Sequence, residues 1–176
     1  MVEKDAVIER QHYKGLAWVA SMALFMQSLD ATILNTALPT IATDLQTPVF
    51  EMQMAIIAYS LAVALFIPLT AWAAAKFGTL TVFRSAVFTF VFGSVACAMA
   101  ASLETLVLAR ILQGIGGAFM MPVARLAIIQ TVPKNQLINA WNLMATAGLI
   151  GPIIGPILGG WLVVHTSWHW IFLINI

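Results

Sequence analysis

Long apolar segments constrain this chain more than any other feature. A helix that crosses a membrane needs about 20 consecutive, mostly apolar residues. Five segments meet that length, and a sixth opens at Trp168: residues 15–38, 53–75, 82–101, 105–131 and 138–164. They lack the short alternating pattern of a membrane β-barrel. The sequence therefore predicts an all-α membrane protein with five complete transmembrane helices and the start of a sixth.

The composition supports this class and excludes others. Of the 176 residues, 61% are hydrophobic and only 9% are charged, whereas soluble domains carry about a quarter charged residues. Such a chain is neither a soluble enzyme nor a disordered tail. Its net charge of +1 gives no reason to expect nucleic acid as a partner. The one cysteine, Cys97, excludes a disulfide framework.

Basic residues predict the orientation, because cytoplasmic loops are enriched in Lys and Arg. Seven of the eight basic residues fall in the tail 1–14 or near the second and fourth connectors: Lys4, Arg10, Lys14, Lys76, Arg84, Arg125 and Lys134. The other three connectors contain no Lys or Arg, and the acidic residues Asp44, Glu51 and Glu104 lie in the first and third of the five connectors. We therefore predict a cytoplasmic tail over 1–14, followed by membrane helices over 15–176. Six tryptophans near the span ends suggest interfacial belts: Trp18, Trp72, Trp141, Trp161, Trp168 and Trp170.

Asp30 is an acid within the first apolar segment. Charged groups are costly in a bilayer and mark functional sites. A helical projection places Ser28, Thr32 and Asn35 on one stripe, whereas Asp30 points nearly opposite, with Gln27 closer to it. One face should contact a neighbouring helix and the other a cavity, and either assignment is open. Asp30 is either a carboxylate that gains and loses a proton or one locked structurally to backbone donors or an arginine.

Arg110 is the second candidate, early in the fourth segment. It shares a helical face with Gln113, Gly117 and Met121. A guanidinium stays charged in proteins, so it must meet a carboxylate, carbonyl groups or water. Two interpretations follow: pairing inside the bundle, or extension of the side chain to the membrane surface.

The fifth segment superposes two patterns. Glycines recur every fourth residue, at Gly151, Gly155 and Gly159, and Gly160 follows. Small residues at this spacing let helices approach closely. Pro152 and Pro156 each remove a backbone hydrogen bond. We expect a contact that is tightly docked yet able to bend, rather than packing alone.

No pattern indicates an enzyme. No nucleophile–base set or phosphate-binding loop is visible, so we predict no catalytic residue and no cofactor. His165 and His169 lie four residues apart in a short connector, but this pair is a weak signal, and we predict no metal site.

Four stretches together resemble the major facilitator superfamily, specifically the fourteen-span drug:proton antiporters of the EmrB/QacA type and, within them, HsrA-like transporters. The stretches lie in the first, fourth, fifth and sixth segments: residues 29–39, 109–117, 151–160 and 168–175. The resemblance implies proton coupling through Arg110. It also implies that the glycine–proline motif of the fifth segment serves conformational change.

One motif departs from that family. Its second cytoplasmic loop usually contains an aspartate and several basic residues. Here Ala75 stands at the aspartate position, and only Lys76 and Gly78 are retained. The resemblance therefore implies that most of the charged lock between the two halves of such transporters is missing.

The resemblance leads to a functional hypothesis. The chain is the N-terminal portion of a proton-coupled multidrug exporter of the bacterial inner membrane, and the C-terminal half is a missing partner. Asp30, Arg110, Gln113, Gln27 and Asn35 are the expected proton-coupling and cavity residues. Protons and drug-like small molecules would be the ligands of the full-length form, and the lipid bilayer its surroundings. The alternative is a truncated membrane protein that does not transport, a remnant or an interaction partner of intact transporters.

Overall fold

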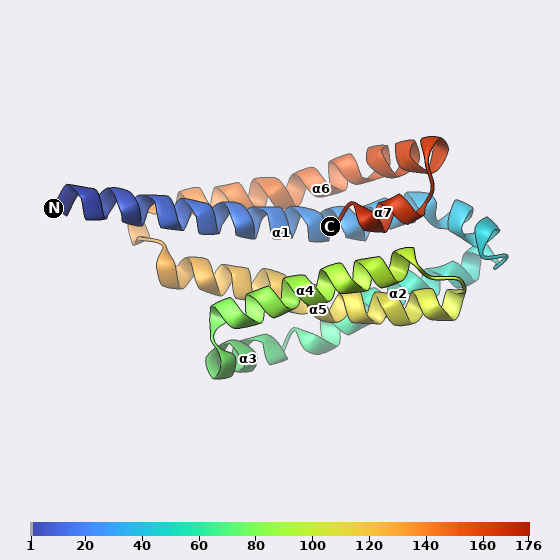
Figure 1. The fold of residues 1–176 in the computed structure, drawn as a ribbon, viewed down its shortest axis with the longest axis horizontal. Coiled ribbons are helices and arrows are strands. Elements are labelled where there is room, and N and C mark those ends of the chain that lie inside the picture. Colours follow the sequence, from blue (N-terminus) through green and yellow to red (C-terminus); the bar gives the residue numbers. More distant parts are fainter. Residues whose placement is uncertain (1) are drawn as a thin grey trace.

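The structure is a computed structural model that describes the backbone of residues 2–176 and the side chains of residues 15–176 (Figure 1). The predicted tail over 1–14, with Lys4, Arg10 and Lys14, lies outside the described side chains. Its helices are α1 (Val2–Asp44), α2 (Val49–Phe66), α3 (Leu69–Phe77), α4 (Thr79–Ala98), α5 (Leu103–Thr131), the short 3-10 helix η1 (Lys134–Gln136), α6 (Leu137–His165) and α7 (His169–Leu173). Residues 2–176 contain no strand, and five helices are long and apolar enough to cross a membrane. The predicted fold class is confirmed.

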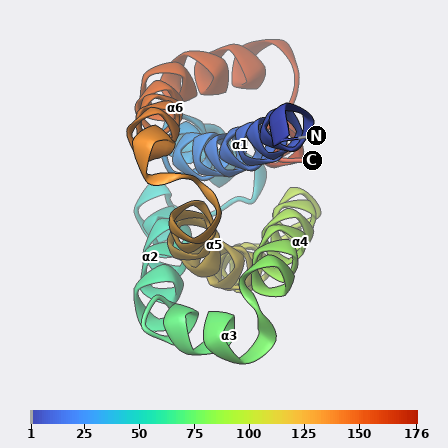
Figure 2. The same ribbon diagram turned by 90° about the vertical axis from the view of Figure 1, so that its left-hand side faces the viewer.

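The helices form two packed groups. In Figures 1 and 2, α1 and α6 run side by side along most of their length, while α5 packs between α2 and α4. The short α7 turns back beside α1, so the chain ends next to the middle of that helix (Figure 1). The connections α1–α2, α4–α5 and α6–α7 lie at the end of the bundle away from the N-terminus, here called the far end.

The first span is longer than predicted. We expected it to end at residue 38 because Pro39 follows, but α1 continues through Pro39 to Asp44. Proline removes one backbone hydrogen bond, yet it leaves the rest of the helix possible. Ile41 and Ala42, beyond the proline, are fully or almost fully buried against the bundle. This packing holds the helix together where the local signal predicts an end.

The second span is not the continuous helix predicted over 53–75. The chain forms α2 to Phe66, bends at Ile67 and Pro68, and resumes as α3. Pro68 lacks the N–H that would continue the α2 ladder, and its ring clashes with the preceding turn. Around the bend, Ile67, Pro68 and Leu69 are all exposed. Unlike the α1 residues after Pro39, they gain no burial that would keep the helix straight.

The core has apolar layers on both sides of a polar one. One buried cluster lies toward the far end and includes Ile33, Leu106 and Phe172. A second cluster lies toward the N-terminal end and includes Ala20 and Val123. Four buried polar residues of α1, α4 and α5 lie between these clusters: Asp30, Ser94, Arg110 and Gln113.

Candidate ion-pair site

An ion pair occupies the middle of the bundle. Nη1 of Arg110, on α5, lies 2.7 Å from Oδ2 of Asp30, on α1, and each side chain is only 1% exposed. The predicted pairing is confirmed, and the alternative in which Arg110 reaches the membrane surface is wrong. An isolated buried charge is very costly, so each group depends on the other for compensation.

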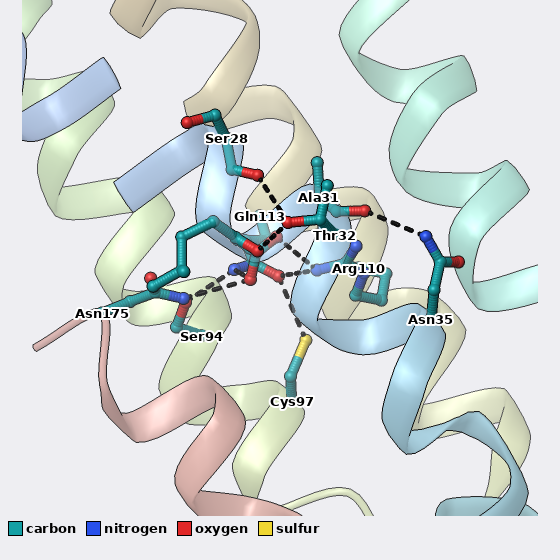
Figure 3. A network of polar contacts seen from close by, with 11 residues as sticks. Ser28, Ala31, Thr32, Asn35, Ser94, Cys97, Arg110, Gln113 and Asn175 are labelled. Atoms are coloured by element: carbon teal, nitrogen blue, oxygen red, sulfur yellow. Dashed lines mark hydrogen bonds and ion pairs between the residues drawn. The ribbon is translucent and has the colours of Figure 1, made fainter. Parts of the chain in front are cut away.

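Two amides complete the coordination of the carboxylate. Nε2 of Gln113 donates to Oδ1 of Asp30 at 2.8 Å, and Nδ2 of Asn175 donates to the same oxygen at 3.1 Å. Asp30 therefore accepts three hydrogen bonds, from α5 and from the residues that follow α7. The donor side chains, Arg110, Gln113 and Asn175, are labelled in Figure 3. Hydrogen bonds to a charged acceptor are stronger than neutral ones.

The network extends to α4. Ser94 Oγ accepts from Nε2 of Gln113 at 2.6 Å and from Nδ2 of Asn175 at 3.0 Å. Oε1 of Gln113 accepts from Nη1 of Arg110 at 2.7 Å, and the thiol of Cys97 points at the same oxygen at 3.6 Å. A change in the charge of Asp30 on α1 therefore affects contacts with α4, with α5 and with the residue Asn175 that follows α7. The predicted set did not include Ser94 or Asn175; the available signal was that each is a single polar residue in an apolar stretch.

Tyr59 of α2 was also missed. Its ring lies under the guanidinium of Arg110, with 4.4 Å between the Arg110 Cζ atom and the ring centroid. Phe172 of α7 lies near the same Cζ, at 5.9 Å. Contacts of this kind between a cation and an aromatic face are attractive within about 6 Å. Sequence alone does not distinguish a tyrosine in an apolar helix from ordinary core.

The other two predicted residues on α1 do not bind the pair. Gln27 donates through Nε2 to the backbone oxygen of Gly117 at 3.1 Å. Asn35 is exposed, and its Nδ2 donates to the backbone oxygen of Ala31 at 3.5 Å. Figure 3 shows Asn35 pointing away from Asn175 and Ser94. Asp30, Arg110 and Gln113 thus meet, Gln27 lies beside α5, and Asn35 stands apart.

The glycines of α6 lie against the other polar face of α1. Gly151, Gly155 and Gly159 are buried, and Pro152 and Pro156 are exposed. A Cβ atom at Gly151 would collide with Oγ of Ser28, and one at Gly155 with Oγ1 of Thr32. The projected stripe of α1 that holds Ser28 and Thr32 therefore faces α6, and the opposite face carries Asp30. Gly160 is not part of this close contact, because a Cβ there would be 3.9 Å from the nearest atom, Thr36 Cγ2.

The two retained residues of the cytoplasmic loop motif, Lys76 and Gly78, lie at a turn between two helices. Gly78 joins α3 to α4 with φ of 83°, a backbone region that favours glycine. Nζ of Lys76 lies 5.0 Å from the centroid of the Trp72 ring and 5.3 Å from that of Phe77. Among the described residues Lys76 has no acidic partner.

One tryptophan differs from the expected belt. Trp168 is buried, and its Nε1 donates to Oδ2 of Asp44 at 2.7 Å. It therefore ties the start of α7 to the end of α1 instead of facing the membrane surface. Within residues 15–176, no group of three or more His, Cys, Asp and Glu side chains is placed to hold a metal ion.

Fold and site together define a multi-pass helical membrane protein with a sealed ion pair between its helices. The family model of the Major Facilitator Superfamily matches residues 20–176. The chain belongs to this superfamily and is related to transporters, not to enzymes.

Two curated relatives illustrate the kinship. "Probable transport protein HsrA" of Haemophilus influenzae is 84% identical over 168 residues, which are 96% of this chain and 36% of that protein. "Putative multidrug resistance protein MdtD" of Yersinia pestis is 48% identical over 159 residues, which are 90% of this chain and 34% of that protein. The chain thus spans about a third of the length of these relatives, consistent with an N-terminal portion.

Proposed function

We propose that the chain is the N-terminal part of a proton-coupled multidrug efflux transporter that works by substrate:proton antiport. The observation that carries the proposal is the pair of Asp30 and Arg110, buried at 2.7 Å and linked to α4 and α7. A buried acid among helices marks a proton or substrate pathway. The name of the MdtD relative supports drug-like small molecules as the exported substrates.

The proton would act through the charge of Asp30. When a proton from outside binds a carboxylate oxygen, Asp30 becomes neutral and its attraction to Arg110 falls. Arg110 keeps its bond to Oε1 of Gln113. Release of the proton to the cytoplasm restores the carboxylate and the full pair. Each change alters the acceptor shared by Gln113 and Asn175, and therefore the contacts among α1, α4, α5 and α7.

The remaining predicted residues would serve the conformational change between outward- and inward-facing states. Gly151, Gly155 and Gly159 let α6 approach α1 closely, and Pro152 and Pro156 loosen the turns before them. We assign this helix pair the bending or sealing contact. Gln27 and Asn35 would line the cavity shared with the C-terminal half. Lys76 and Gly78 would lie in a cytoplasmic loop of the inner membrane protein, on the same side as the N-terminus.

The test uses a full-length transporter that contains this segment, reconstituted in vesicles. Asp30→Asn should abolish the proton movement driven by drug, because an amide does not take up the proton. Asp44→Asn is the matched control: it makes the same change on the same helix, but Asp44 lies outside the ion-pair network. Unchanged coupled efflux in the Asp30 variant would remove Asp30 from the mechanism. Energy-dependent dye efflux by this chain alone would contradict the need for a second half.

A further inference from the structure

The guanidinium of Arg110 is held unevenly. Among the described residues, its hydrogen bonds to Asp30 and Gln113 both come from Nη1. Its Nε has no hydrogen-bond partner among the described residues. The ring of Tyr59 lies 4.4 Å from the guanidinium carbon. Arg110 is thus fixed by polar contacts at one nitrogen and by an aromatic face elsewhere.

Two glycines of α5 make room for Tyr59. A Cβ atom at Gly114 would lie 2.7 Å from the backbone oxygen of Tyr59, and one at Gly117 would lie 2.8 Å from its hydroxyl oxygen. Gly114 and Gly117 follow Arg110 by four and seven residues, so they share its helical face. Tyr59 itself is 7% exposed. Tyr59 therefore packs into the space that Gly114 and Gly117 leave on the Arg110 face of α5.

We propose that Tyr59 is a positioning residue for Arg110: the face of its ring retains the guanidinium when Asp30 is neutral, and so sets how readily Asp30 exchanges its proton. This inference rests on the proposed proton coupling and adds a residue to it.

Few other groups around Arg110 could retain its guanidinium in place of the Tyr59 ring. Asp30 is the one carboxylate that faces the guanidinium among the described residues. From α4 comes the thiol of Cys97, which points at Gln113. From α7 comes Phe172, and from the residues after α7 comes the uncharged Asn175. Within α6, the titratable side chain is His165, in the last turn at the far end. Once Asp30 is protonated, the attractive contacts that remain are Oε1 of Gln113, the ring of Tyr59 at 4.4 Å and, farther away, the ring of Phe172 at 5.9 Å.

The experiment titrates Asp30 in this chain, purified in lipid bilayers. The infrared carbonyl band of the protonated carboxyl group is followed against pH and assigned by its loss in Asp30→Asn. Position 59 carries phenylalanine, difluorophenylalanine or trifluorophenylalanine. Fluorine withdraws electron density from the ring face with little change in size, so folding is preserved and the attraction for the cation falls stepwise.

We expect the midpoint of the Asp30 titration to move stepwise toward acid, by about 0.4–1.5 pH units over the series. The reason is that a ring with a weaker attraction for the cation gives less stabilisation to the state in which Asp30 is protonated and Arg110 has lost its anion. Tyr59→Phe alone should titrate like the parent chain. Phe90, buried on α4 against Gly116, is the matched control position, and its fluorination should leave the midpoint unchanged.

A midpoint of the Asp30 titration that stays constant across the fluorinated variants at position 59 would overturn the proposal. An equal shift of the midpoint on fluorination of Phe90 would also overturn it. A shift already complete in Tyr59→Phe would assign the effect to the hydroxyl and also overturn it. This titration requires no transport. If the antiport test of Asp30 fails while the series still shifts, the positioning role stands and the proposed function falls.

Discussion

Nη1 of Arg110 lies 2.7 Å from Oδ2 of Asp30, and neither side chain is more than 1% exposed. Removal of one partner leaves the other charge buried without an opposite charge. We therefore predict that Arg110→Met lowers the free energy of unfolding by about 3–5 kcal/mol, measured by denaturant titration in mixed micelles. The double variant Asp30→Leu with Arg110→Met should recover most of the loss, because it removes both charges.

Arg125→Met is the matched control for that measurement. Arg125 is exposed, and its Cζ lies 5.7 Å from the centroid of the Trp141 ring. We expect a change within about 0.5 kcal/mol, as for most surface substitutions. A loss in Arg110→Met no larger than this would show that the buried pair does not compensate two costly charges.

The contact between α1 and α6 gives a second prediction. A Cβ atom at Gly155 would collide with Oγ1 of Thr32, so Gly155→Ala should cost about 1–3 kcal/mol of stability. Thr32→Ala should restore part of it by removing that oxygen. Gly160→Ala is the control, since its Cβ would meet open space apart from Thr36 Cγ2 at 3.9 Å. Equal losses at Gly155 and Gly160 would contradict close packing of α6 against α1 at Gly155.

Local sequence signals predicted the spans well and the proline effects poorly. Pro39 and Pro68 both interrupt apolar segments, yet α1 continues through the first and the second separates α2 from α3. The difference is tertiary: Ile41 after Pro39 is fully buried, whereas Leu69 after Pro68 is 44% exposed. Helical periodicity does not contain that information.

The two charged residues of the site were predictable from the sequence. Asp30 and Arg110 are conspicuous because ionisable groups are costly in apolar helices, and Gln113 follows Arg110 on the same face. Asn175 reaches Asp30 only because α7 folds back beside α1, which no local pattern shows. Tyr59 was missed because its role depends on a ring that faces a helix distant in sequence.

The hydrogen bond from Trp168 to Asp44 gives a third prediction. Trp168→Phe keeps an aromatic ring but removes the donor of the 2.7 Å bond. The start of α7 should then open more easily, by about 0.5–1.5 kcal/mol, seen as faster amide hydrogen exchange over residues 168–173. Trp170→Phe, at an exposed position, should leave that exchange unchanged. Equally fast exchange in both variants would mean that the bond to Asp44 does not hold α7.

Orientation in the membrane gives the last prediction. The basic residues Lys76 and Lys134 flank connectors at the N-terminal end of the bundle, whereas Glu104 lies at the far end. Because cytoplasmic loops carry the excess of Lys and Arg, cysteines introduced at positions 76 and 134 of a Cys97→Ala chain should react with a membrane-impermeant maleimide only after the cells are opened. A cysteine at position 104 should react on intact cells. All three positions are exposed, so burial does not limit the reaction. Labelling of positions 76 and 134 on intact cells would invert the topology and place the proposed direction of proton release on the wrong side.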